Sequence, residues 1–264
     1  MAAEAEVIDK GAVINDFITH HVLVNNPEWH PFGNLVHIPL PAWLPMQGFM
    51  VVLAAVFLVL IFTLGYKRTA AVPTGITNVC EVFVVFVRDN IVVPNIGEHD
   101  SKKMTPLFCS FFFFILMLNL LGQIPIFAAA TGNVNVTFAL AFITFLFMSV
   151  GTIIKNGPIG FFKAFIPHGI PFWVLLLLVP IEFVGMFIKA AALTIRLFAN
   201  MMAGHIVVLA LLSLAIAIKM WVAILVVPMG VAISLLEVFV CFLQAYVFTL
   251  LSAMFIGQMH HPSH

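Results

Sequence analysis

The residues of this 264-residue chain with the most evident chemistry lie inside its two longest apolar runs. The ionisable members are Glu182, Lys189, Arg196, His205 and Glu237, and the nearby amides are Asn200 and Gln244. An arginine at the centre of a bilayer costs about 2.5–3.5 kcal/mol even on the lowest scale, so ionisable residues at such depths are candidates for function. Histidine titrates near pH 6.5, and desolvation raises the pKa of a glutamate toward that range, so the chemistry that these residues could perform is proton transfer.

The first of the two runs carries a polar stripe. Glu182, Lys189 and Arg196 follow one another at intervals of seven residues. At about 100° per residue they lie within roughly 40° of one another on a helix, and Asn200 shares their face. His205 comes nine residues after Arg196, about 180° around the helix and roughly 13 Å further along it. It therefore faces different surroundings.

The second run returns alongside the first. Glu237 and Gln244 are seven residues apart and share a helix face. A hairpin folded at 218–219 would place Gln244 near the depth of Arg196, and Glu237 further out, toward His205.

Arg196 is the hardest of these residues to explain by packing alone. No acidic residue lies three or four positions away, and an arginine guanidinium does not lose its proton in proteins. We predict that another subunit supplies its partner. A permanent positive charge between titratable groups on separate faces describes a barrier between two proton paths, because it repels a protonated relay and attracts an ionised carboxylate.

The other polar positions also have simpler interpretations. Lys189 can extend to the membrane surface or pair with Glu182. His205 can be a packed histidine. Asn119 and Gln123, one turn apart in an earlier apolar segment, are typical of hydrogen bonds between helices.

The composition predicts a membrane protein. Hydrophobic residues make up 63% of the chain and charged residues 8%, against roughly 25% charged in soluble domains. The net charge is zero and there is no basic run, which argues against a nucleic-acid partner. The three cysteines are widely spaced within largely apolar sequence, so we expect neither a disulfide framework nor a metal site, and no cofactor.

The apolar segments predict an all-α fold of about five to six helices in a single polytopic domain, 46–257. The predicted helices are 46–66, 75–93 lying at the interface, 104–128, 134–154, 173–218 and 220–257. Residues 94–103 read as a polar loop, and the Gly- and Pro-rich 156–172 as a re-entrant or interfacial stretch. The polar segment 1–45 does not resemble a cleavable signal peptide, and 258–264 is a short tail.

The last two segments are about twice as long as a perpendicular span requires. Helices of about 46 and 38 residues would measure roughly 69 and 57 Å. Two very long antiparallel helices, tilted beyond the usual angle of about 20°, would fit one bilayer and would form a C-terminal hairpin that needs a partner surface. The alternative is that each run hides two short spans, with kinks at Pro180 and Pro228.

The loop charges predict the orientation. Most lysines and arginines outside the apolar runs, between Lys67 and Lys163, fall on one side, while Lys10 and Lys219 fall on the other. By the positive-inside rule the first side is internal, so the N-terminal segment is outside and the tail inside.

Residues 193–205, "LTIRLFANMMAGH", resemble subunit a of the F-type ATP synthase. The family pattern Arg-Leu-Phe-Gly/Ala-Asn-Met-x-Ala-Gly is present at 196–204. Further matches are "LQAYVF" at 243–248, "NLLGQIP" at 119–125 and "GNVNVT" at 132–137. In well-known bacterial members a glutamate stands at the position of His205 and a histidine at the position of Glu237. The arrangement His205 and Glu237 is that of mitochondrial and alphaproteobacterial relatives, and it preserves one group of each kind.

The resemblance implies a mechanism. Protons would enter from outside near His205 and Glu237, protonate a carboxylate of the c-ring, and leave inward near Glu182. Arg196 would keep the ring carboxylate ionised and prevent a direct leak, while its own face and that of Gln244 lie against the ring.

The resemblance also implies the partners and the location. The partners would be the c-ring, the peripheral-stalk b subunits, other ATP synthase subunits and membrane lipid. The location would be the bacterial inner membrane rather than the mitochondrial one. The chain has no phosphate-binding loop, so nucleotide chemistry would belong to a separate sector and this chain would not be an enzyme.

Two other classes of protein are weighed against this one. A secondary transporter or channel usually shows inverted repeats, whereas the three early segments here do not resemble the two long ones. A haem-binding electron carrier needs paired histidines on facing helices, and only His205 lies well inside a predicted span.

Overall fold

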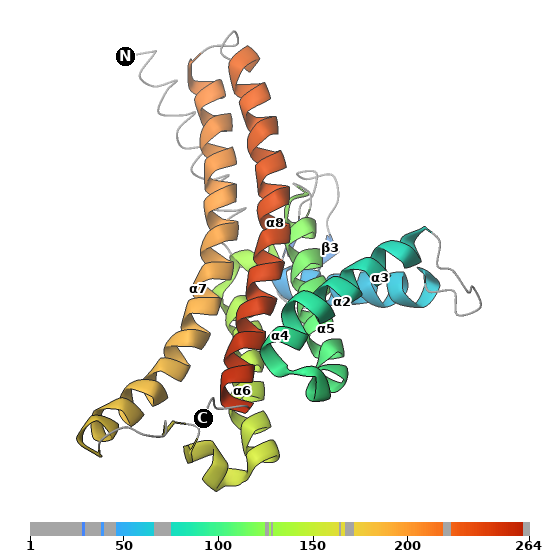
Figure 1. Ribbon diagram of the computed structural model, residues 1–264. Coiled ribbons are helices and arrows are strands. Elements are labelled where there is room, and N and C mark those ends of the chain that lie inside the picture. Colours follow the sequence, from blue (N-terminus) through green and yellow to red (C-terminus); the bar gives the residue numbers. More distant parts are fainter. Residues whose placement is uncertain are drawn as a thin grey trace. The chain divides into compact units, whose positions relative to one another are not determined.

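The chain is helical nearly throughout the part that the structure describes. The structure is a computed structural model that describes residues 28–29, 38–39, 46–65, 75–124, 127, 129–163, 165–166, 172–218 and 223–260 (Figure 1). Its α-helices are α2 (Met46–Gly65), α3 (Ile76–Val87), α4 (Val93–Ile96), α5 (Glu98–Gly122), α6 (Val134–Lys163), α7 (Phe172–Ile218) and α8 (Ala223–His260). The π-helix η2 (Arg88–Val92) joins α3 to α4, and the 3-10 turn η3 (Ala130–Gly132) precedes α6.

The described part of the N-terminal segment adds one short strand pair. Strands β1 (Glu28–Trp29) and β3 (Ile38–Pro39) are antiparallel, with Glu28 opposite Pro39 and Trp29 opposite Ile38. The remainder of the predicted segment 1–45 lies outside the described residues.

Five of the helices are long and apolar enough to cross a membrane. The apolar stretches are Met46–Thr63, Glu98–Gly122, Val134–Phe161, Trp173–Val208 and Val226–His260. Hydrocarbon offers no partner to a free N–H or C=O group, so a spanning segment must make its backbone hydrogen bonds within itself, as a helix does. The predicted all-α membrane fold is confirmed.

Helices α7 and α8 are each continuous. They contain 47 and 38 residues and appear in orange and red in Figure 1. Pro180 and Pro228 lie inside them without ending them, as prolines can in membrane helices. The alternative of two short spans in each run is therefore wrong, while the strong tilt remains a prediction.

The region 94–103 is not the loop that the sequence predicted. Helix α4 occupies its start, and α5 begins at Glu98 after Gly97, whose φ of 86° lets the chain turn. Glu98 and Asp100 lie in the first turn of α5, where the helix dipole favours negative charge. The polar residues that suggested a loop thus begin the helix, which ends at Gly122 rather than at 128.

Helix α6 extends beyond its predicted end at 154. It continues to Lys163 across a break at Gly157, where φ is 76° and ψ is 168°. Pro158 restarts the helix at a position that a proline tolerates, because its missing N–H would have had no partner there. Half of the stretch predicted to be re-entrant is therefore helical.

Contacts divide the chain into two compact units, which are described separately. The first comprises 1–54, 117–133 and 198–243, and the second comprises 55–116, 134–197 and 244–264. Helices α7 and α8 each contribute to both units.

In the second unit, aromatic side chains join α5 to the last part of α8. Phe111 and Phe248 meet edge to face, with ring centroids 5.9 Å apart. Such pairs contribute about 0.5–1.5 kcal/mol beyond the area that they bury. The hydroxyls of Thr144 on α6 and Ser252 on α8 are 3.1 Å apart, so a buried hydrogen bond joins α6 to the core that α5 and α8 form.

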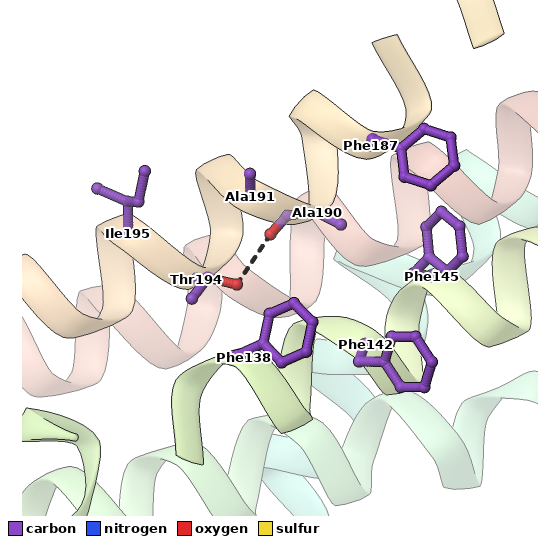
Figure 2. Close-up of a pocket in the computed structure, with 8 residues that line it drawn as sticks. All are labelled: Phe138, Phe142, Phe145, Phe187, Ala190, Ala191, Thr194 and Ile195. Atoms are coloured by element: carbon purple, nitrogen blue, oxygen red, sulfur yellow. Dashed lines mark hydrogen bonds between the residues drawn. The ribbon is translucent and has the colours of Figure 1, made fainter. Parts of the chain in front are cut away.

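Aromatic residues also join α6 to the first half of α7. Phe138, Phe142 and Phe145 follow one face of α6, and Phe145 lies 5.1 Å from Phe187 between ring centroids (Figure 2). These four rings, together with Ile195 and its neighbours on α7, line a cavity between the two helices.

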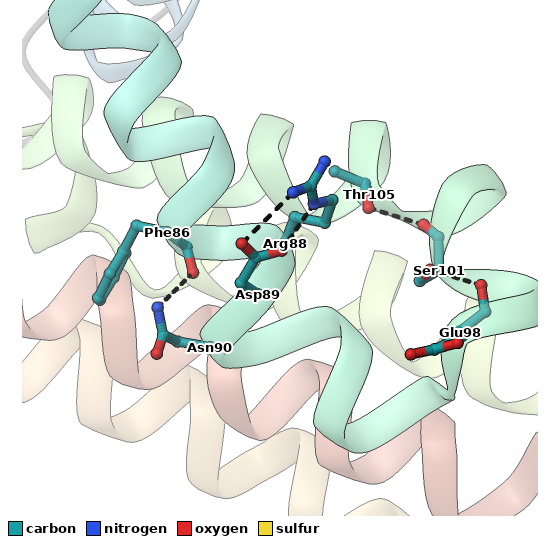
Figure 3. Close-up of polar contacts among 7 residues, drawn as sticks. All are labelled: Phe86, Arg88, Asp89, Asn90, Glu98, Ser101 and Thr105. Atoms are coloured by element: carbon teal, nitrogen blue, oxygen red, sulfur yellow. Dashed lines mark hydrogen bonds and ion pairs between the residues drawn. The ribbon is translucent and has the colours of Figure 1, made fainter.

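Polar contacts gather where η2 leads into α5. The Arg88 side chain donates a hydrogen bond of 2.7 Å to Asp89, and Asn90 donates to the carbonyl of Phe86 (Figure 3). The hydrogen bond from Arg88 lowers the pKa of Asp89, and the pair is exposed to solvent. Two of the charges of the segment predicted to lie at the interface, Arg88 and Asp89, are thus paired with each other.

Gly257 is the tightest backbone contact in the second unit. A Cβ atom there would overlap the carbonyl oxygen of Asn95 and lie 3.0 Å from its carbon. We expect Gly257→Ala to destabilise the protein by about 1–3 kcal/mol, because a backbone carbonyl cannot move aside as a side-chain end can.

The measurement is the thermal unfolding midpoint of the purified protein in detergent. Gly230→Ala is the matched control, since it lies in the same helix with nothing within 4 Å of its Cβ position. Equal midpoints for the two variants would contradict the close contact.

Candidate functional site

Helices α7 and α8 meet closely in the first unit at Gly204. A Cβ atom at this glycine would overlap Oε1 of Glu237 and lie 3.0 Å from its Cδ. The absence of a side chain at 204 therefore lets the glutamate of α8 lie against α7. His205 is the next residue of α7, and the expectation that Glu237 lies toward it stays a prediction.

Gln123 reaches both long helices. Its Nε2 lies 3.6 Å from Sγ of Cys241 on α8 and 3.9 Å from Sδ of Met201 on α7. Within this unit, Met201 is thus near Cys241 while Gly204 meets Glu237. From the first contact to the second, the residue number increases on α7 and decreases on α8. These parts of the two helices therefore run antiparallel.

Asn119 anchors the segment that carries Gln123. Its Oδ1 accepts a hydrogen bond of 2.9 Å from the hydroxyl of Thr131, and both side chains are buried. Asn119 and Gln123, predicted as hydrogen-bonding residues, thus serve different contacts. Asn119 fixes its own segment, and Gln123 reaches the pair of long helices.

Two atoms at this contact are buried without a hydrogen-bond partner among the described residues. They are Nε2 of His205 and Oε1 of Glu237. Leaving a buried donor or acceptor unsatisfied costs about 1–3 kcal/mol, so such groups call for an explanation. An imidazole nitrogen and a carboxylate oxygen are groups that can accept and release protons.

The second unit holds Arg196. Its side chain is exposed, and among the described residues it has neither an ion-pair nor a hydrogen-bond partner. Glu182, on the same stripe, is exposed as well. Neutralisation of Arg196 by Glu182 is therefore not part of this structure.

Lys189, between these two residues, has partners of its own. Its Nζ donates a hydrogen bond of 3.1 Å to Oε1 of Gln258 and lies 5.4 Å from the ring centroid of Phe255. Both partners are on α8. The pairing of Lys189 with Glu182, one of the two simpler interpretations, is absent, and the lysine instead links α7 to the end of α8.

Gln244 also belongs to the second unit. Its side chain is buried, and its Nε2 has no hydrogen-bond partner among the described residues. Asn200 is half-buried in the first unit. The predicted residues are thus divided, with Asn119, Gln123, Asn200, His205 and Glu237 in the first unit and Glu182, Lys189, Arg196 and Gln244 in the second.

Three residues of these contacts were not predicted. Gly204 carried a signal, because a glycine beside a polar residue in a membrane helix is typical of close helix packing. Met201 and Gln258 carried none, since which residues face them depends on the register between α7 and α8. No group of three His, Cys, Asp or Glu residues in the described part is arranged to hold a metal ion.

The contact at Gly204 generates a prediction. We expect Gly204→Ala to displace the Glu237 carboxylate and to destabilise the protein by about 1 kcal/mol, less than Gly257→Ala, because a side-chain end can move aside. Glu237→Asp in the same background should restore most of that loss, because the shorter side chain withdraws from the new methyl group.

A double-mutant cycle on the thermal midpoint tests this coupling. Gly230→Ala combined with Glu237→Asp provides the control pair, as Gly230 has no neighbour within 4 Å of its Cβ position. Strict additivity of Gly204→Ala and Glu237→Asp would show that the two residues do not touch.

Comparison with known proteins gives consistent matches. A family model described as "ATP synthase A chain" matches residues 48–257. Among curated relatives, "ATP synthase subunit a" of Anaeromyxobacter dehalogenans (strain 2CP-C) is 41% identical over 267 aligned residues, covering 97% of this chain and 69% of that protein. The protein of the same name from Chlorobium phaeobacteroides (strain BS1) is 44% identical, covering 92% of this chain and 75% of its own length.

The relatives differ in how much longer they are. "ATP synthase subunit a" of Anaeromyxobacter sp. (strain Fw109-5) is 46% identical over 218 residues. The match covers 80% of this chain but only 53% of that protein.

Proposed function

Because this chain belongs to the ATP synthase A chain family, we propose that it is the proton-translocating stator subunit of an F-type ATP synthase. It is a multi-pass membrane protein with five helices of spanning length, and the proposed location is the bacterial inner membrane. It would provide two half-channels, ending at different depths, to a rotating c-ring. The proposed role is non-catalytic, because nucleotide chemistry belongs to a separate sector.

The observation that carries the proposal is the state of Arg196. The side chain is charged at any physiological pH, lies in the apolar stretch Trp173–Val208, and is exposed without a partner among the described residues. A lone arginine in hydrocarbon is expensive, so the exposed position favours a carboxylate supplied from outside the chain. A carboxylate on the c-ring is the partner that the family implies.

The outer half-channel is assigned to the contact around Gly204. His205 and Glu237 bring an imidazole and a carboxylate to facing helices, and each has a buried atom without a hydrogen-bond partner among the described residues. Gln123 borders the same place through Cys241 and Met201. An imidazole and a carboxylate can each bind and release a proton and so can pass it inward, which Arg196 cannot do.

The inner half-channel is assigned to the polar stripe of α7. Glu182 is exposed on the stripe of Arg196, about 14 residues or roughly 21 Å before it along the helix. Asn200 and Gln244 complete the faces that would lie against the ring. The further partners proposed are the peripheral-stalk b subunits, other ATP synthase subunits and lipid.

The first functional prediction concerns Arg196→Ala in the assembled complex. Proton-driven ATP synthesis in inverted membrane vesicles should fall below detection, because no other residue holds the ring carboxylate ionised at the interface. ATP hydrolysis by the detached catalytic sector should be unchanged.

Arg88→Ala serves as the matched control. Arg88 is an exposed arginine outside the spanning stretches, already paired with Asp89, and its loss should leave synthesis intact. Substantial ATP synthesis with Arg196→Ala would exclude the stator role of this arginine.

The second functional prediction concerns His205 and Glu237. Replacing either by leucine should slow proton uptake on the order of 10²-fold, the lower end of what a positioned acid or base contributes. The double variant should be little worse than the more damaging single one, since both serve one path.

The readout is the quenching of a pH-sensitive dye in vesicles energised by ATP. Losses that add fully in the free energy of activation would show that the two residues work independently, against a shared half-channel.

A further inference from the structure

A cavity of about 310 Å³ opens between α6 and α7 in the second unit. Its lining residues are Phe138, Phe142, Phe145, Phe187, Ala190, Ala191, Thr194 and Ile195 (Figure 2). All of them lie in the spanning stretches Val134–Phe161 and Trp173–Val208. The cavity is therefore at the depth of the hydrocarbon, and no proposed half-channel residue lines it.

The cavity lies on the side of α7 away from Arg196. At about 100° per residue, Phe187 is roughly 180° and Thr194 roughly 160° around the helix from the arginine. Ala191, between them, is roughly 140° away. The cavity therefore does not share the face assigned to the c-ring.

The lining of the cavity is suited only to an apolar ligand. Its one polar side chain is Thr194, whose hydroxyl donates a hydrogen bond of 3.1 Å to the carbonyl of Ala190 within the same helix (Figure 2). No lining group is left to bind a headgroup, a sugar or a charged ligand. Four phenylalanines and two alanines instead offer flat and shallow walls.

The shape of the cavity follows the helices. Its lining residues recur at helical spacing over residues 138–145 of α6 and 187–195 of α7, or roughly 10 and 12 Å of helix length. The cavity is thus elongated along two membrane-crossing helices.

From this lining, depth and direction we propose that the cavity between α6 and α7 holds one acyl chain of a membrane phospholipid. The chain lies along the two helices, in contact with the rings of Phe138, Phe142 and Phe187. A lipid tail gains little from leaving the bilayer, so its residence rests on dispersion contacts with the walls. The bound tail fills the space behind Thr194 and supports α7 opposite its arginine.

The test labels the intact ATP synthase carrying this chain. The complex is reconstituted into phosphatidylcholine and phosphatidylglycerol vesicles with a small fraction of phospholipid bearing a diazirine at mid-chain. After irradiation, labelled peptides are mapped by mass spectrometry. We expect residues 138–145 and 187–195 to carry about fivefold more label than Val56, Val59 and Leu60 of α2, which are exposed without a cavity.

Filling the cavity provides the second arm. Ala191→Phe should reduce labelling of the cavity to the level of α2, and Leu177→Phe is the matched control on an exposed part of α7 outside the cavity. Wild-type labelling no greater than that of α2 would overturn the proposal, and so would cavity labelling unaffected by Ala191→Phe. A third outcome would also overturn the proposal: detergent reduces the labelling of the cavity, whereas added unlabelled phospholipid does not. That result would mean binding of an adventitious additive only.

The comparison of labelling between the cavity and α2 is made in the wild-type complex, so it does not depend on whether any variant assembles. The readout also involves neither ATP synthesis nor Arg196, so failure here would leave the proposed function untouched, and failure of Arg196→Ala to abolish synthesis would leave this proposal untouched.

Discussion

The hydrocarbon of the membrane offers no hydrogen-bond partner, and this constraint governs the rest of the structure. It requires each spanning segment to satisfy its own backbone, which gives the long uninterrupted helices α7 and α8. It also makes every charged or amide side chain within them expensive. The chain meets this cost locally for Lys189, through Gln258 and Phe255, and for Asn119, through Thr131. Within the described part of the chain it does not do so for Arg196, His205 or Glu237, and the proposed function rests on that difference.

The residues without side chains matter as much as the polar ones. Gly204 admits Glu237 to the surface of α7, and Gly257 admits the carbonyl of Asn95 to the surface of α8. In lipid, helices do not associate by the hydrophobic effect, so close van der Waals contact at small residues supplies much of the attraction. The same small residue at 204 thus serves both helix association and the placing of a carboxylate.

The sequence was informative where a property is local. The lengths of the apolar runs predicted α7 and α8, and the lack of an acid within a turn of Arg196 predicted an arginine without a partner in its own helix. The region 98–103 was misjudged because polar residues at a membrane surface suit a hydrated loop and the first turn of a helix equally well. The partner of Lys189 was out of reach for another reason. It depends on the register between α7 and α8, which no pattern within either segment determines.

The break in α6 has a mechanical consequence. A straight helix transmits an axial load along its hydrogen-bonded rod, whereas the backbone at Gly157, with φ of 76°, interrupts that rod before Pro158. In the stator role proposed above, the subunit would have to withstand the torque of a rotor. In the second unit, such torque would therefore be borne by the unbroken end of α8, through Phe248 against α5 and Ser252 against the part of α6 that precedes the break. The stretch after Gly157 can change its direction at the break while α8 and the earlier part of α6 keep their positions.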